Sequence, residues 1–397
     1  MASFGIVGKR CWRLLGLLSR AAFTIVVRQG WSLPVPFVSH SGTTMNADNV
    51  ESTCRDTFGH EHFDLEKCVA GFHRGCPVRG CTTPLEETRH GTGKIPFCRT
   101  HGLRLHANTF VYFNGAGSDF DGRLRNFVIQ REAASRVALA KGKKVESHRL
   151  GYEMSEDALS WNIFVGVAEA GKLRGAIYVL TGKEVRGDPK LYLWAQLIDI
   201  ANGSLEAYAP LSEVRRRLEP DIKKFHTEPD VMLVAEGELT VCIEAKFGSG
   251  NPIAHNKTVK AGEKPVNSDE LVARYYDKAG SRTKQSIVVE GIKGTFHSQL
   301  FRNVVFASEM ADRGEWHVVN LVSTSQLRDE PKSLAYSFVD PTEQVRAYLS
   351  SGLAQNFTYR SWEGLYRELI EPDPDLLSLR SYMKSKSAHF APAFQGI

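Results

Sequence analysis

The stretch from His226 to Phe247, HTEPDVMLVAEGELTVCIEAKF, constrains the fold more than any other part of this 397-residue chain. Apolar residues alternate with other residues over 231–235 and again over 239–245. A short glycine-containing segment, Glu236-Gly237-Glu238, separates the two runs. Two apolar runs of period two around such a segment predict a hairpin of two antiparallel strands.

A three-residue loop would set the register of this hairpin. Ala235 then faces Leu239, and counting outwards places Asp230 directly opposite Glu244. Lys246 lies two residues beyond Glu244, on the same face and about 7 Å along the strand. A slip of one residue would move Glu244 to the other face of the sheet, so the site depends on this loop.

Two facing carboxylates are unusual in a purely structural hairpin, because like charges directly opposite one another weaken a sheet. A hard cation such as Mg²⁺ favours this oxygen-rich setting. Lys246 adds a compact charge that can orient an attacking water or stabilise a phosphoryl transition state. The alternative is a surface hairpin whose Asp, Glu and Lys form a solvated ladder. Pro229 before Asp230 and the agreement of the two strand patterns favour a site.

Pro229-Asp230 followed by Glu244-Ala245-Lys246 resembles the motif of the PD-(D/E)xK phosphodiesterase superfamily, the restriction-endonuclease-like fold. The resemblance covers residues 125–325, about half of the chain. It implies an α/β domain with a mixed central β-sheet flanked by helices, built in the order α, β, β, β, α, β. It further implies that Asp230 and Glu244 bind Mg²⁺ or Mn²⁺ and that Lys246 assists the attacking water.

The superfamily often supplies one more acid from a helix that precedes the motif strands. A helix is predicted over 155–165 with Ser155 as its N-cap, and it carries Glu156, the first candidate. Glu132, on a helix predicted over 126–141, is the second candidate. A solvated helix face is the alternative for either acid.

After the motif, the segment GTFHSQLFRN resembles a helix in which a Gln or Asn assists the active site of some superfamily members. The candidate here is Gln299, on a helix predicted from Thr295 as its cap to Gly314. Asn303 shares a face with Gln299. Composition rich in Tyr, Trp, Leu and Ile predicts strands over 172–181, 190–200 and 316–323.

Two stretches are rich in basic residues. The first, in a short helix predicted over 211–218, is the run Arg215-Arg216-Arg217, for which a solvated surface is expected before phosphate contact. The second is a long polar loop after Lys246, which could hold a nucleic-acid backbone through Lys257, Lys260 and Lys264.

Cysteine and histidine gather between residues 68 and 106. Cys76-x4-Cys81 and Cys98-x2-His101 form two pairs separated by sixteen residues. Two close pairs on separate turns supply the four ligands of a structural zinc site. The alternative is a set of unrelated reduced cysteines. Reserve ligands near the two pairs are Cys68, His73 and His106.

The length predicts several regions. These are a basic extension over 1–47, a Cys/His zinc-binding region over 48–124, the nuclease-like domain over 125–325 and a helical C-terminal extension over 326–397. The acid-free extension is either an organelle-targeting peptide or lies upstream of a true start at Met45. The second is favoured, because a stretch of balanced composition begins at Met45. Its apolar pieces are too short to span a bilayer, and no membrane partner is expected.

Seven cysteines, an odd number, argue against a secreted disulfide scaffold, so a cytoplasmic location is expected. The net charge of +5 permits nucleic-acid binding. The chain is therefore expected to be a Mg²⁺-dependent endodeoxyribonuclease of the restriction type that acts on DNA, with a homodimer as a possible assembly. The alternative is a zinc-containing DNA- or protein-binding protein whose nuclease-like domain is catalytically silent.

Overall fold

The computed structural model describes residues 63–69, 72–90, 93–113, 120–141, 148–199, 205–222, 228–255, 266–292, 295–311, 314–326 and 335–397. All of them belong to one compact unit, Asn46–Ile397. The predicted extension over 1–47 lies outside the described residues. In the described part of the chain, none of the helices has the length and apolar character needed to cross a membrane.

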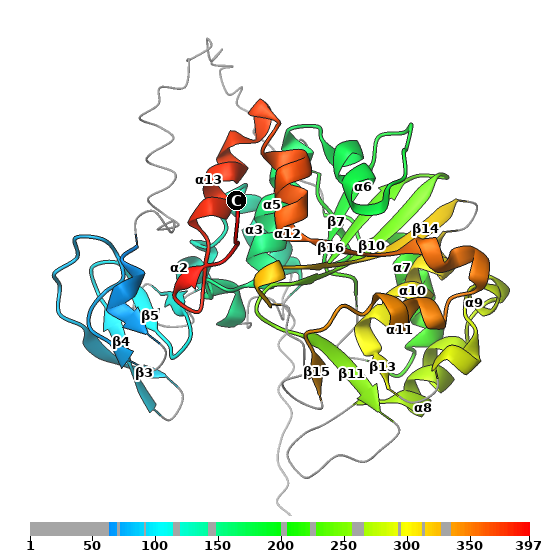
Figure 1. Cartoon of the computed structure of the whole chain (residues 1–397), viewed down its shortest axis with the longest axis horizontal. Helices are drawn as coiled ribbons and strands as arrows, with labels where there is room; N and C mark the ends of the chain where they lie inside the picture. The colour runs from blue at the N-terminus through cyan, green and yellow to red at the C-terminus, as the bar shows by residue number, and fades with distance from the viewer. Residues whose placement is uncertain are drawn as a thin grey trace, which may run out of the picture. The chain divides into compact units, whose positions relative to one another are not determined.

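A six-stranded mixed sheet forms the centre of the fold (Figure 1). Its strand order is β16-β14-β10-β9-β7-β8. Its strands are β7 Lys190–Leu193, β8 Gln196–Leu197, β9 Val231–Ala235, β10 Leu239–Lys246, β14 Glu315–Val322 and β16 Phe357–Ser361. β10, β14 and β16 run parallel, whereas β9, β7 and β8 continue the sheet antiparallel. The prediction of a mixed central sheet is confirmed.

The central hairpin has the predicted register. Ala235 pairs with Leu239 and Val231 pairs with Ile243, across a turn in which Gly237 has a φ of 73°. This left-handed conformation suits glycine, which lacks a Cβ. One step beyond the last pair, Asp230 lies opposite Glu244 at the end of the sheet where the motif was expected.

Helices cover both faces of the sheet (Figure 1). One layer comprises α5 Glu156–Glu169, α6 Leu173–Thr181, α12 Trp362–Leu365 and α13 Leu377–Ser385, and the other contains α7 Ala209–Leu218 and α10 Ser298–Met310. Strand β10 is buried on both faces, and its successive residues enter different cores. Ile243 packs with the α5 layer and Cys242 with the α10 layer. Such two-sided burial is usual for strands of parallel sheets beneath helices.

The predicted strand over 172–181 is wrong, because these residues form helix α6. Leu173, Ala176, Ile177 and Leu180 are buried at helical spacing, and Gly182 ends the helix with a φ of 73°. The run over 190–200 is two strands. Trp194 and Ala195, with φ values of 51° and 60°, form the turn between β7 and β8.

Helix α5 begins as predicted: the Ser155 side chain accepts a hydrogen bond from the Ala158 amide at 3.2 Å. Helix α10 begins later than predicted, at Ser298 rather than after a Thr295 cap. The reason is that Phe296–His297 form a short strand, β13, paired with β11 Asn251–His255.

A second sheet lies beyond the end of β10. It contains β11, β13, β12 Val266–Asn267 and β15 Tyr336–Ser337, and β15 pairs with β11. The helical segments of this region are α8 Ser268–Leu271, η4 Val272–Tyr276, α9 Ser281–Ser286, η5 Val289–Ile292, η6 Thr324–Gln326 and α11 Thr342–Ala347.

The N-terminal part of the described chain forms an antiparallel sheet of β3 Glu86–His90, β4 Gly93–Cys98, β5 Leu103–Leu105 and β6 Phe110–Tyr112. Shorter elements flank it: η2 Leu65–Lys67, β1 Cys68–Val69 and β2 Phe72–His73. The chain then passes through α2 Phe120–Leu124, α3 Arg131–Ala140 and η3 His148–Gly151 to α5.

Residues 326–397, expected as a helical extension, also contribute the strand β16 to the central sheet. Their remaining elements are η7 Ser351–Asn356, η8 Tyr366–Ile370, η9 Pro374–Leu376 and the hairpin of β17 Ser387–Ala388 with β18 Ala391–Pro392. Just before this hairpin, buried Lys386 lies 3.1 Å from Glu153. Glu153 also accepts a hydrogen bond from Tyr112 at 3.1 Å, so the C-terminal segment is tied to β6.

Candidate functional site

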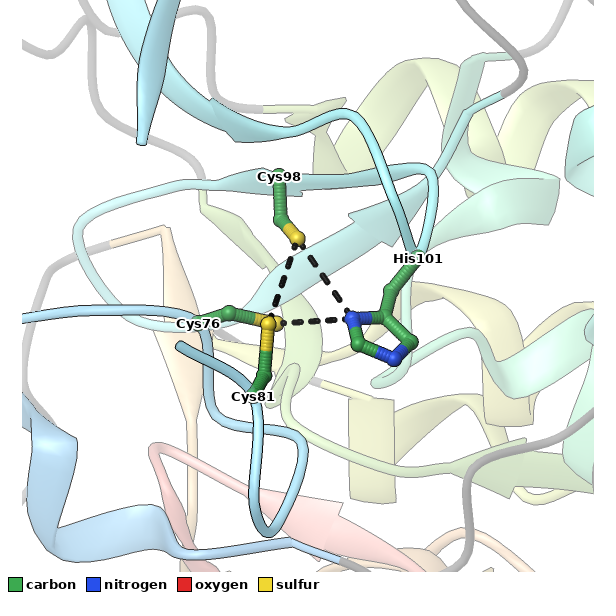
Figure 2. Close-up of side chains that lie close together, drawn as sticks. All are labelled: Cys76, Cys81, Cys98 and His101. Carbon is green, nitrogen blue, oxygen red and sulfur yellow. Dashed lines mark hydrogen bonds between the residues drawn. The ribbon is translucent and has the colours of Figure 1, made fainter. Parts of the chain in front are cut away.

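The predicted Cys/His group could hold a metal ion. The ligand atoms of Cys76, Cys81, Cys98 and His101 all lie within 4.8 Å of one another (Figure 2). The Cys81 and Cys98 sulfurs are 3.9 Å apart, and His101 Nδ1 lies 3.5 Å from the sulfurs of Cys76 and Cys98. A tetrahedral zinc with ordinary bond lengths separates two sulfurs by about 3.8 Å and sulfur from nitrogen by about 3.6 Å.

Two tight turns bring these four side chains together. Cys76 and Cys81 flank a turn in which Gly80 has a φ of 74°. Cys98 ends β4, and His101 lies in the following turn, where Gly102 has a φ of 57°. A Cβ atom on Gly102 would lie 2.5 Å from the Phe113 carbonyl oxygen, so the close approach of the chain after β6 also requires glycine there.

The three reserve ligands lie elsewhere. The Cys68 thiol donates to the Gly75 carbonyl at 3.7 Å. The His73 ring packs against Phe390 and the His106 ring against Tyr152, each with 5.2 Å between ring centroids. The group is therefore the quartet that the spacing predicted.

Burial raises the pKa of the Cys76 and Cys98 thiols, because a thiolate is poorly solvated there. Burial would also raise the pKa of Cys81, but hydrogen bonds, those from Thr83 first, outweigh burial and lower it. Burial, together with the charge of Arg125, lowers the pKa of His101. A bound cation would offset the cost of the thiolates, as metals do for coordinating thiols.

A cleft of ≈ 610 Å³ opens at the end of β10. Three of the residues predicted for the active site line it: Glu156, Lys246 and Gln299. Its other lining residues are Arg149, Ser249, Gly250, Pro252, Tyr336 and Phe338. Asp230 and Glu244 lie beside Lys246 on the hairpin, so the fold brings all five predicted residues to one place.

Glu244 and Lys246 form a buried pair at the base of the cleft. Lys246 Nζ lies 2.6 Å from Glu244 Oε1, and Lys246 and Glu244 are 5% and 1% exposed. Asn303 on α10 donates to Glu244 Oε2 at 2.9 Å. Each carboxylate oxygen of Glu244 therefore has a donor, as a buried charge requires.

The negative charge of Asp230 is less well compensated than that of Glu244. Its Oδ2 accepts a hydrogen bond from the Ala245 amide at 2.9 Å. Burial and the negative charge of Glu244 nevertheless raise the pKa of Asp230 well above its usual range. Burial alone would lower the pKa of Lys246, but the neighbouring carboxylates, Glu244 first, outweigh burial and raise it. Lys246 is therefore a cation at neutral pH.

Glu156, the upstream acid, anchors the chain that leaves β10. Its Oε1 accepts hydrogen bonds from the Phe247 amide at 2.9 Å and from the Ser249 hydroxyl at 2.5 Å. Glu132, the second candidate for this acid, is exposed on α3. The helix cap at Ser155 was the signal that predicted Glu156 in the first turn of α5, where it lines the cleft.

Asn303 was expected only to share a helix face with Gln299, and no sequence pattern singled out the amides of Asn320 and Asn251. Gln299 lines the cleft, and its buried Oε1 has no hydrogen-bond partner among the described residues, whereas Asn303 contacts Glu244 directly. Asn320 on β14 donates to the Glu244 carbonyl at 3.2 Å and accepts from Asn251 at 2.8 Å. The available signal for Asn320 was a polar residue within the apolar run Val318–Val322.

The arginine run of the first basic stretch does not line this cleft. In it, Arg215 pairs with Glu228 at 3.0 Å and Arg216 with Glu213 at 2.6 Å, while Arg217 pairs with Glu309. The surface interpretation of this run is therefore favoured over phosphate contact. The loop lysines at 257, 260 and 264 lie outside the described residues.

Within the described ranges, the Cys/His quartet is the one group of three or more His, Cys, Asp or Glu side chains placed to hold a metal ion. The cleft has the two acids Asp230 and Glu244 beside it, and the charged group in contact with Glu244 is the Lys246 ammonium. Comparison of the chain with protein-family models, with curated proteins and with solved structures finds no match, so the site has to be interpreted from its own chemistry.

Proposed function

We propose that this protein is a metal-dependent nuclease that hydrolyses DNA phosphodiester bonds. The observation that carries the proposal is the arrangement at the end of the central hairpin. Asp230 immediately precedes β9, Glu244 lies on the neighbouring strand β10, and Lys246 lies beside Glu244 at the base of an open cleft. This group of charges fits phosphodiester hydrolysis better than it fits a solvated ladder, because Glu244 and Lys246 are buried and the pKa of Asp230 is raised.

The order of elements supports the same proposal. Helix α5, strands β7, β9 and β10, helix α10 and strand β14 occur in this order along the chain, with other elements, among them α6 and α7, between them. This is the order α, β, β, β, α, β that the resemblance to the PD-(D/E)xK superfamily implies. β10 and β14 are parallel and are joined through α10, since parallel strands need a long crossover connection.

In the proposed mechanism, Asp230 and Glu244 would hold Mg²⁺ or Mn²⁺. Such a cation, when bound, neutralises charge on the phosphoryl oxygens and lowers the pKa of a coordinated water. Lys246 acts as a hydrogen-bond donor to water or phosphate rather than as a base, because its pKa is raised. Asn303 keeps Glu244 oriented through its hydrogen bond of 2.9 Å.

We further propose that the Cys/His quartet holds a structural zinc. The three separations given above, one between two sulfurs and two between sulfur and nitrogen, fit a tetrahedral ion within about 0.1–0.2 Å. Four protein ligands leave no open position for a substrate or a reactive water, which favours a structural role over a catalytic one.

A second candidate is a zinc-containing DNA- or protein-binding protein whose nuclease-like domain is catalytically silent. The Lys246–Glu244 pair favours this alternative, since the two charges satisfy each other without a metal. The two candidates differ in one measurable property, which is hydrolysis.

The test is cleavage of plasmid DNA and of single-stranded DNA by the full chain with Mg²⁺ or Mn²⁺. Asp230→Ala and Lys246→Ala should abolish cleavage in proteins whose circular dichroism spectra match the wild type. Glu132→Ala is the matched control, because this exposed acid lies on a helix before the motif, and it should cleave normally. Cleavage that survives both site substitutions would refute the mechanism.

A further inference from the structure

One wall of the cleft is aromatic. Tyr336 and Phe338 line it, and Tyr336 is 46% exposed although it belongs to a strand. Tyr336 pairs with Pro252 across the β11–β15 ladder, and Pro252 also lines the cleft. An aromatic ring half-exposed at the mouth of a polar cleft can bind the flat face of a ligand.

The backbone holds this wall close to the reactive residues. Gly250, four residues after Lys246, lies so close to β15 that a Cβ atom would be 2.6 Å from the Ser337 carbonyl oxygen. Asn251 pairs with Ser337, the residue next to Tyr336. The position of Tyr336 is therefore coupled to the end of β10 through a short, tightly packed segment.

The cleft has two positively charged residues, Arg149 and Lys246. Lys246 lies at its base, away from solvent. Arg149 is exposed and lines the cleft together with Glu156, whereas Lys246 is 5% exposed. A phosphodiester that contacts Lys246 must therefore enter the cleft. The volume of ≈ 610 Å³ is typical of pockets for single small ligands. It suits one or two nucleotides of one strand, whereas a base inside a duplex is paired and stacked and would have to leave the stack to enter the cleft.

We propose that this cleft binds single-stranded DNA, with one base stacked on Tyr336. This inference rests on the proposed function, because the stacked nucleotide delivers its phosphate to Lys246. Every base has a π-face, so stacking on Tyr336 selects an unpaired strand without selecting a sequence. Arg149 contributes a sequence-independent contact to the backbone of the same strand.

Binding is measured with the full chain and no added divalent cation, by fluorescence anisotropy of a labelled twelve-nucleotide oligo(dT) and of a duplex of equal length. Stacking on one aromatic side chain is worth about 1–3 kcal/mol, so Tyr336→Leu should weaken single-strand binding about 5- to 150-fold. Tyr336→Trp keeps a π-face and should bind as the wild type does. Tyr178→Leu is the matched control, since Tyr178 is 56% exposed on α6 and does not line the cleft.

The duplex should bind more weakly than the single strand and without dependence on Tyr336. Unchanged single-strand binding by Tyr336→Leu, or duplex binding as tight as single-strand binding, would overturn the inference. The two proposals fail separately. Cleavage of DNA with no effect of Tyr336→Leu on binding refutes the stacking alone. Tyr336-dependent binding without metal-dependent cleavage refutes the nuclease function and leaves the single-strand site standing.

Discussion

Replacing one ligand of the Cys/His quartet tests how far the N-terminal region depends on a metal. Cys98→Ser removes a fully buried sulfur that lies 3.9 Å from the Cys81 sulfur and 3.5 Å from His101 Nδ1. The substitution is nearly isosteric, so packing around it changes little. Its main effect should be the loss of a metal ligand.

The magnitude follows from the size of the region. Residues 63–113 surround a small core that includes Leu103, Leu105 and Phe110. A hydrophobic core in a segment this short supplies at most about 3–5 kcal/mol. Structural zinc contributes about 10–16 kcal/mol in zinc-finger peptides at pH 7. Without the metal, β3 to β5 should therefore unfold locally.

Unfolding should stop before β6. Glu153 donates its amide to the Phe110 carbonyl at 3.0 Å and accepts from the Tyr112 hydroxyl at 3.1 Å, so β6 is held by the central domain as well. The assay is metal analysis combined with hydrogen exchange read by mass spectrometry. Peptides of residues 86–105 should lose protection, while those of β10 keep it.

Cys68→Ser is the matched control. Cys68 is also buried in this core, but its thiol donates to the Gly75 carbonyl and lies outside the quartet. This variant should keep about one zinc per chain and the wild-type exchange pattern. If Cys98→Ser retains metal and protection, or if Cys68→Ser loses as much as Cys98→Ser, the quartet is not a structural zinc site.

Two further predictions concern the acids of the cleft. Because the pKa of Asp230 is raised in the folded state, the free energy of unfolding falls as the pH rises above the ordinary aspartate range. Without added divalent cation, Asp230→Asn should therefore raise the free energy of unfolding by about 0.5–2 kcal/mol at pH 8. Near pH 3 it should change this free energy little; urea titrations at the two pH values measure both effects. A loss of stability at pH 8 would contradict this. Asn303→Ala removes a donor from buried Glu244 and should cost about 1–3 kcal/mol in thermal or urea unfolding. Gln299→Ala is its control and should cost less, because Gln299 Oε1 has no partner among the described residues; equal losses would contradict the role given to Asn303.

Local patterns predicted the parts of this fold that local chemistry decides. Alternation on both sides of Glu236-Gly237-Glu238 was enough for the hairpin and its register, because a turn with a glycine at positive φ has few solutions. Ser155 was enough to start α5, because its hydroxyl caps a backbone amide within the same turn. Cysteine spacing was enough for the quartet, since each pair lies on one tight turn.

Residue composition gave a wrong prediction where β-branched and aromatic residues lie in a helix. The segment KLRGAIYVLT resembles a strand by residue type, yet α6 buries Leu173, Ile177 and Leu180 in the core on one side of the central sheet. Tertiary packing outweighs a propensity difference of a few tenths of a kcal/mol per residue. Tertiary packing also explains why β16, within a region expected to be helical, joins the sheet beside β14.

The sequence by itself therefore determined which residues meet across one hairpin and around one pair of turns, because those contacts are close along the chain. Only the tertiary structure decided what surrounds them. Asn303 and Asn320 lie 59 and 76 residues beyond Glu244 along the chain, and Tyr336 follows both. Long-range packing of α10, β14 and β15 brings these three side chains to the end of β10, and no local pattern encodes that packing.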